Sequence, residues 1–158
     1  MRMPAKAVLL TATLCLSGVV AIPANAAAAA SPESICGSGY ARITGGTQPV
    51  KTSSGRKYGT VYLLYNRSNG YNCVVTIKSS FVGTRTPVSA ELTIMAKPIK
   101  DTKQDPIVRR EKGNFKSYAG PVKYWAQGRC VKFWGTIKPL GHDPAVASGG
   151  RQKWDNCG

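Results

Sequence analysis

The chain has 158 residues, with 22 Lys or Arg against 7 Asp or Glu and a single histidine. This length fits one domain rather than several. The residue types and their spacing exclude a recognisable metal or catalytic constellation, and the excess of positive charge points to anionic partners.

The first 26 residues have the pattern of a secretory signal peptide. Two basic residues precede the apolar run Ala7 to Ile22, and an A-x-A site follows at Ala24 to Ala26. The run is short for a membrane span, and polar residues follow it, so we expect export and cleavage between Ala26 and Ala27. Removal of Arg2 and Lys6 then leaves 20 basic residues against 7 acidic ones, a formal net charge of +13.

Four cysteines remain after that cleavage: Cys36, Cys73, Cys130 and Cys157. An even number of cysteines in an exported domain of this size predicts two disulfides. Of the three pairings, we favour the sequence-adjacent one, Cys36 with Cys73 and Cys130 with Cys157. A zinc site is disfavoured because the cysteines have gaps of 37, 57 and 27 residues and no short C-x2-C spacing.

Residues 27–34 are expected to form a flexible leader ahead of a single domain at 35–158. Gly37 to Gly59 is rich in Gly, Ser and Thr, so it predicts a loop with a short strand at Tyr40 to Ile43. The next segment, Thr60 to Lys78, contains two apolar runs around a polar turn that ends in Asn-Gly, which predicts a β-hairpin.

The alternation of side chains assigns both faces of this hairpin. Tyr62, Leu64, Cys73, Val75 and Ile77 share one face, whereas the other carries Val61, Leu63, Tyr65, Val74, Thr76 and Lys78. Both faces are largely apolar. We therefore expect the hairpin to be central and covered on both sides.

The segment Val88 to Met95 alternates apolar with polar residues and predicts a strand with one solvent-exposed face. Lys97 to Lys116 is strongly charged and contains two prolines, which favours an exposed loop over a short helical turn at Ile107 to Lys112.

A second hairpin is predicted from Phe115 to Lys138 around a tight Gln127-Gly128 turn. A two-residue loop pairs Val122 with Phe133 and Tyr124 with Val131, which leaves four residues together on the opposite face: Lys123, Trp125, Lys132 and Trp134. The tail from Pro139 predicts a short strand or strap held by a disulfide.

These elements predict an all-β fold, a small disulfide-bonded sandwich or barrel of about five to seven mostly antiparallel strands. No long helical periodicity runs through the chain after the predicted cleavage site.

Seven short blocks of residues match a known protein family in the same order along the chain. They are ICGSGY at Ile35–Tyr40, TVYLLYN at Thr60–Asn66, NCVVTIK at Asn72–Lys78, TPVSA at Thr86–Ala90, SYAGPV at Ser117–Val122, GRCV at Gly128–Val131 and the terminal Cys157-Gly158. The chain thereby resembles the spore-associated protein A family of filamentous actinomycetes. The resemblance implies a small exported protein of spores or aerial hyphae and implies no particular enzymatic activity. The basic segments Lys51–Lys57 and Lys97–Lys116 depart from the family pattern and argue against an inert coat role.

Binding is the function that the residues favour. Lys123, Trp125, Lys132 and Trp134 would form a cationic aromatic face, to which the charged segment adds Arg109, Arg110 and Lys112. Lysines supply charge and aromatic rings stack on bases or sugars, so the expected partner is an anionic polymer of the cell wall or spore surface, with nucleic acid as another candidate. Two alternatives remain: the tryptophans pack beneath the tail, or the charge serves solubility and nonspecific retention at an anionic wall.

Catalysis is not expected, and neither is a cofactor or a metal. His142 is followed by Asp143, but no serine lies in a nucleophile-elbow context and the cysteines are expected to be oxidised. A ribonuclease-like set would need Glu91, Arg129 and His142 together, and nothing in the sequence brings them close. A secreted toxin or inhibitor acting through Lys97 to Lys116 is a further alternative, weakened because no cysteine brackets that segment.

Overall fold

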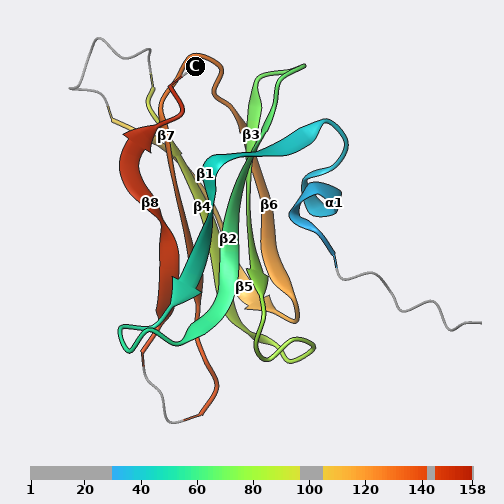
Figure 1. The fold of residues 1–158 in the computed structure, drawn as a ribbon, viewed down its shortest axis with the longest axis vertical. Helices are drawn as coiled ribbons and strands as arrows, with labels where there is room; N and C mark the ends of the chain where they lie inside the picture. The colour runs from blue at the N-terminus through green and yellow to red at the C-terminus, as the bar shows by residue number, and fades with distance from the viewer. Residues whose placement is uncertain (1–29, 97–104, 142–144, 158) are drawn as a thin grey trace, which may run out of the picture.

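The computed structural model describes residues 30–96, 105–141 and 145–157. Within these residues it contains one short helix and eight strands (Figure 1). Their bounds are α1 Pro32–Cys36, β1 Tyr40–Lys51, β2 Lys57–Asn66, β3 Tyr71–Lys78, β4 Thr86–Ile94, β5 Ile107–Phe115, β6 Tyr118–Trp125, β7 Val131–Ile137 and β8 Ala147–Asp155.

The strands form a single antiparallel sheet in the order β5-β4-β7-β8-β1-β2-β3-β6. The sheet curls into a nearly closed barrel, and its two end strands, β5 and β6, meet at a seam. There the backbone N–H of Gly120 donates to the Glu111 carboxylate, and the Arg109 guanidinium lies 4.8 Å from the centre of the Tyr124 ring. The predicted all-β class is confirmed.

The barrel interior is filled by the apolar residues of alternating strand positions. The largest of its fully buried side chains include Leu63, Leu92, Ile94, Val131 and Phe133. Val88, Ala90, Leu92 and Ile94 of β4 all point inward, as the alternation predicts. The opposite face of β4 is less exposed to solvent than expected, since Ser89 is buried against Thr136, with their hydroxyl oxygens 2.5 Å apart.

A second, smaller core lies outside the barrel, between the β2–β3 hairpin and α1. Leu64 and Val75 are fully buried there beside the Cys36–Cys73 disulfide. Burial of each such side chain contributes about 1.5–3 kcal/mol. The helix therefore explains why both faces of the hairpin are apolar, and the expectation that both are covered is confirmed.

The hairpin register also follows the predicted parity. Leu64 pairs with Cys73 and Tyr62 with Val75, around a four-residue turn that begins at Arg67. The second disulfide joins Cys130 to Cys157, so both bonds follow the sequence-adjacent pairing.

The N-terminal part of the domain is more regular than the sequence indicates. The expected leader 27–34 overlaps α1, whose N-cap is Ser31, with its hydroxyl oxygen accepting the Ser34 N–H at 3.0 Å. The expected loop after Ile43 is wrong, because β1 continues to Lys51. An irregularity between Arg42 and Thr47 interrupts its pairing with β2 and contains the Gly45-Gly46 pair, so the glycines mark a bulge inside a strand.

The charged segment 97–116 is not a loop throughout. Its first residues lie outside the described ranges, but Ile107–Phe115 forms β5 and pairs with β4 along its whole length. Arg110 and Lys112 lie at its outer positions and are exposed, because solvent covers that side of the sheet.

The predicted second hairpin is wrong. β6 pairs with β3, and β7 pairs with β4 and β8, so Val122 lies opposite Val74 and Phe133 opposite Leu92. The segment 126–130 instead crosses one end of the barrel (Figure 1). The tail forms β8, in agreement with the predicted short strand or strap.

The opposite end of the barrel is closed by side chains. The buried Lys78 ammonium donates to the carbonyl oxygens of Thr84 at 2.7 Å and Phe115 at 3.3 Å, and burial lowers the pKa of this lysine. Tyr58 stacks on Phe81 with 6.0 Å between ring centres. No helix in the described part of the chain is long and apolar enough to cross a membrane.

Candidate functional site

The residues predicted to form one cationic aromatic face lie on two separate surfaces. Lys123 and Trp125 point outward from β6, whereas Lys132 and Trp134 point outward from β7. β4 and β5 lie between these strands around the barrel. The outward orientation of each residue follows from the alternation within its strand. The prediction of one shared face was wrong, because it required β6 to pair with β7, and these strands do not pair.

The first surface is the outer side of β5, β4 and β7, which we call the β4–β7 surface. Its residues include Arg110, Lys112, Lys132 and Trp134, together with Trp154 of β8. The strand register aligns Arg110, Glu91 and Trp134 in one row across the sheet, with Lys112, Ser89 and Thr136 in the next. Four of the predicted residues therefore share this surface.

The β4–β7 surface carries both cations and aromatic rings. The Lys132 ammonium lies 4.2 Å from the centre of the Trp154 ring, a cation–π contact. Arg110 donates from Nε to the Glu91 carboxylate at 2.7 Å, so the charge of this arginine is partly neutralised. Lys112 and Lys138 line a hollow of about 440 Å³ together with Thr136. Two of its six lining residues are therefore lysines, beside the apolar Pro87, Val88 and Val146.

The second surface is the outer side of β3 and β6, which we call the β3–β6 surface. Tyr71 and Trp125 are cross-strand partners, and each is 40% exposed. The Arg129 guanidinium lies 4.9 Å from the centre of the Trp125 ring, and the Lys123 ammonium lies 5.1 Å from that of Tyr40. Adjacent exposed rings with attached cations form a platform on which a sugar or base can stack.

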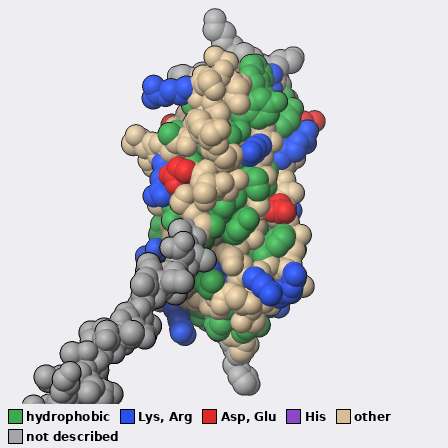
Figure 2. Space-filling view, turned by 90° about the vertical axis from the view of Figure 1, so that its right-hand side faces the viewer, with side chains coloured by type: hydrophobic (Ala, Val, Ile, Leu, Met, Phe, Trp, Pro, Cys, Tyr) green, Lys and Arg blue, Asp and Glu red, His purple; other side chains and the backbone are tan. Residues whose placement is uncertain are grey.

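Figure 2 views the side of the molecule on which α1 lies. Lys and Arg side chains are spread over it among hydrophobic side chains, with fewer Asp and Glu. Partial burial, and then the nearby Tyr71 phenol, raise the pKa of Tyr40. The Tyr40 ring, uncharged at neutral pH like any ordinary tyrosine, holds the Lys123 cation against its face.

Arg109 belongs to neither surface. It lies at the β5–β6 seam, stacked on Tyr124, where it serves closure of the barrel.

Comparison with known proteins identifies the family. Spore-associated protein A of Streptomyces coelicolor (strain A3(2)) is 34% identical to this chain over 150 residues, which cover 93% of this chain and 80% of that protein. The chain belongs to the spore-associated protein A family. No family model and no solved structure matches it.

This family assignment agrees with the resemblance seen in the sequence blocks. Two disulfides are typical of oxidising compartments, and together with a spore-associated relative they are consistent with an extracellular location. The predicted cleavage site between Ala26 and Ala27 lies outside the described residues.

Several residues of the two surfaces were not predicted from the sequence. Tyr71 shares the parity of Cys73, so its outward orientation was available from alternation alone. The contact of Tyr71 with Trp125 could not be predicted in this way, because the β3–β6 pairing is nonlocal. Trp154 was likewise missed, since the neighbours of the tail strand cannot be assigned from local patterns. Lys138 was missed because its place beside β4 depends on the nonlocal β4–β7 pairing.

The residues considered for catalysis are not assembled. Glu91 lies on the β4–β7 surface with Arg110, and Arg129 lies on the β3–β6 surface with Trp125. His142 and Asp143 lie outside the described residues. Among the residues that are described, no three His, Cys, Asp or Glu side chains group in a way that could hold a metal ion.

Proposed function

We propose that this member of the spore-associated protein A family is a non-catalytic protein of the spore or cell envelope. Its basic exterior holds it to an anionic polymer of that envelope. The observation that carries the proposal is the excess of exposed positive charge, and the family assignment supports the location.

The few acidic groups do little to offset this charge. Glu33, Glu91 and Asp155 each pair with an arginine, and Glu111 accepts a backbone hydrogen bond. Many cations remain at exposed positions throughout the described ranges, among them Lys51, Arg67, Lys112, Lys123 and Lys138. A net charge of +13 after removal of residues 1–26 attracts the protein to any dense polyanion.

The two surfaces suggest where such a polymer binds. Lysine and arginine neutralise phosphate or carboxylate groups, while Trp125, Trp134 and Trp154 offer faces to sugar rings or bases. A wall polymer such as a teichoic acid or an acidic polysaccharide meets this description. Nucleic acid is the competing ligand, because its phosphates and bases suit the same residue types.

The proposal is tested by fractionating a culture into spores, cell walls and medium, and then washing the isolated envelope. We expect the protein in the envelope fraction and its release by about 0.5–1 M NaCl, because salt screens exposed charges at that concentration. A wash with sucrose at the same osmotic strength is the control and should release little. Retention in high salt contradicts attachment by charge, and accumulation in the medium favours a diffusible effector such as a toxin or inhibitor.

The non-catalytic part of the proposal has its own test. Glu33, Glu91, Glu111 and Asp155 are each engaged by a partner, which leaves them poorly suited to act as general acids or bases. A further candidate is the single histidine, His142. We expect His142→Ala to behave as wild type in any bioassay that first shows an activity, and a loss of that activity contradicts the proposal.

A further inference from the structure

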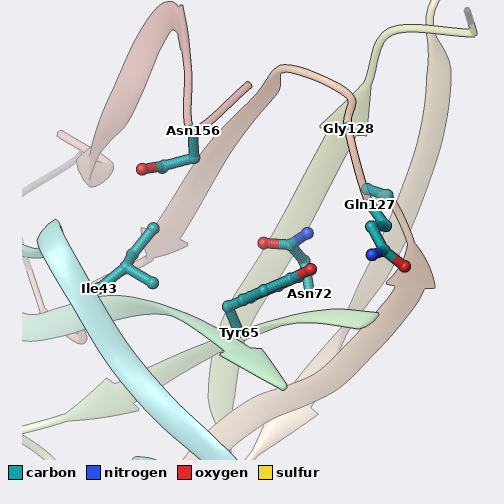
Figure 3. A pocket seen from close by; sticks show the side chains of 7 residues that line it. Ile43, Tyr65, Asn72, Gln127, Gly128 and Asn156 are labelled. Atoms are coloured by element: carbon teal, nitrogen blue, oxygen red, sulfur yellow. The ribbon is translucent and has the colours of Figure 1, made fainter. Parts of the chain in front are cut away.

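A pocket of about 500 Å³ opens at the end of the barrel where β2 ends and β3 begins. Pockets for small ligands generally have volumes of about 300–1,000 Å³. Figure 3 shows side chains from several elements around it. It is lined by Ile43, Tyr65, Asn72, Ala126, Gln127, Gly128 and Asn156.

The strand parity explains why this end of the barrel is polar. Tyr65 and Asn72 are cross-strand partners that continue the inward-facing positions of Leu63 and Val74. Leu63 and Val74 are fully buried and complete the core, whereas the next pair toward the barrel end carries a phenol and a carboxamide. The pocket is therefore an extension of the barrel interior with hydrogen-bonding groups at its mouth.

The rim of the pocket is held in place by the fold itself. The Ala126 N–H donates to the Gly70 carbonyl oxygen at 3.0 Å, and the Arg129 N–H donates to the Ala126 carbonyl oxygen at 3.1 Å. The Cys130–Cys157 disulfide ties the segment that contains Asn156 to this same loop. A site that is already formed loses less conformational entropy when a ligand binds.

The lining has a definite chemistry. Asn72, Gln127 and Asn156 supply three carboxamides, Tyr65 supplies a hydroxyl and a ring, and Ile43 and Ala126 supply apolar surface. Carboxamides and hydroxyls both donate and accept hydrogen bonds, as the hydroxyl groups of a sugar do. None of the lining residues is charged, so the pocket provides no counter-ion for a charged ligand.

From these features we propose that the pocket at the barrel mouth binds an uncharged sugar unit, with an N-acetylated sugar preferred. The methyl of an acetamido group suits Ile43 or Ala126, and its N–H and C=O suit a carboxamide. The inference goes beyond attachment by charge and does not depend on it, because the lining carries no charge.

A nucleobase fits the arrangement less well. The three carboxamides come from β3, the 126–130 segment and the chain after β8, so they surround the pocket from different directions (Figure 3). Hydroxyl groups radiate around a sugar ring in the same manner, whereas a base presents its polar groups along the edges of a plane. Base recognition also favours stacking between aromatic groups, and Tyr65 is the one aromatic residue of the lining.

The test is a titration of the purified, disulfide-intact protein in 0.5 M NaCl, followed by NMR chemical shifts. The probes are tri-N-acetylchitotriose, cellotriose and adenosine, each up to about 10 mM, because an uncharged ligand held by a few hydrogen bonds binds weakly. We expect saturable shifts with tri-N-acetylchitotriose, weaker binding of cellotriose and none of adenosine.

Two variants with matched controls locate the site. Gln127→Ala removes an exposed carboxamide of the lining, and Tyr65→Phe removes only a hydroxyl. Each should weaken sugar binding about three- to tenfold, the equivalent of one net hydrogen bond. Gln152→Ala removes an exposed carboxamide on β8, Tyr62→Phe removes a hydroxyl on the outer face of β2, and both should bind as wild type.

Three results overturn the proposal: no binding of either sugar, binding of adenosine in place of sugar, or sugar binding that Gln127→Ala and Tyr65→Phe leave unchanged. None of them bears on attachment by charge, which is measured by the release of the protein from envelopes with salt.

Discussion

The Glu111 carboxylate of β5 accepts the backbone N–H of Gly120 in β6, at the seam where the barrel would otherwise lie open. The β3–β6 register passes from Ala119 to Val122, so Gly120 has no partner in that ladder. Its N–H turns instead toward β5, where a side chain replaces the missing strand partner. A partly buried N–H is costly to leave unpaired, so this contact helps to hold the end strands together.

Replacement of Glu111 should therefore destabilise the barrel. We expect Glu111→Ala to lower the free energy of unfolding by about 2 kcal/mol, since hydrogen bonds to charged groups contribute about 1.5–3 kcal/mol. Glu111→Gln should cost less, because its amide oxygen still accepts. Urea unfolding of the oxidised protein measures both. The control is Glu91→Ala, which breaks an outer-surface ion pair worth about 0–1 kcal/mol; an equal loss in the two alanine variants contradicts the role given to Glu111.

Local patterns predicted those parts of the fold that local physics decides. The β2–β3 hairpin followed from alternation and a polar turn, because register and turn are set within twenty residues. Outward orientation of Lys123 and Trp134 followed from parity within each strand. Both disulfides matched the sequence-adjacent pairing.

Nonlocal pairing decided the rest. β5 was missed because Arg109 to Lys112 are four charged residues in succession, and only its place beside β4 makes it a strand. The Gln127-Gly128 turn suggested a β6–β7 hairpin, but β6 pairs better with the apolar β3. The candidate site divided into two surfaces for this reason, and Tyr71 became the neighbour of Trp125.

The two disulfides should differ in their effect on stability. Their sequence separations are 37 and 27 residues, so the chain-entropy model assigns nearly equal contributions, about 3–4 kcal/mol each. Cys36 and Cys73 are fully buried in the small core under α1, whereas Cys157 is partly exposed. We expect replacement of both Cys36 and Cys73 by Ser to lower the free energy of unfolding, measured in urea, by more than replacement of both Cys130 and Cys157 does. The reverse order contradicts the role of the small core.

Gly135 should tolerate no side chain. A Cβ at this position would lie 2.3 Å from Thr76 Oγ1 and 2.8 Å from Val61 Cβ, inside the barrel. We expect Gly135→Ala to cost about 1–3 kcal/mol through overpacking. Gly128→Ala, at a site with open space and a φ of +68°, should cost about 1 kcal/mol through backbone strain alone. Thermal unfolding compares the two, and an equal or smaller loss for Gly135→Ala contradicts this packing.

The ion pair between Glu33 and Arg42 gives a small pH dependence. The hydrogen bond from the Arg42 guanidinium lowers the pKa of the Glu33 carboxyl below its ordinary value of 4.5. Because the folded-state pKa is the lower one, the stabilisation is complete above pH 4.5 and is lost as the pH falls through the folded-state value. Both side chains are exposed, so we expect no more than about 1 kcal/mol. The measurement is the free energy of unfolding from pH 3 to 6. It should rise less steeply with pH in Glu33→Gln than in the wild type, and equal slopes in the two proteins contradict the prediction.

The separation of the two surfaces predicts how Trp125 and Trp134 contribute to polymer binding. Trp125 is 40% exposed beside Tyr71, so Trp125→Ala should weaken binding to the envelope polymer or single-stranded nucleic acid at least about fivefold at low salt, without changing the melting temperature. Trp125→Phe keeps a ring and should lose less. Trp134 lies across the barrel from this contact, so the losses from Trp125→Ala and Trp134→Ala should add in the double variant. Strong coupling between the two, measured by a double-mutant cycle, would mean that the ligand uses one continuous site.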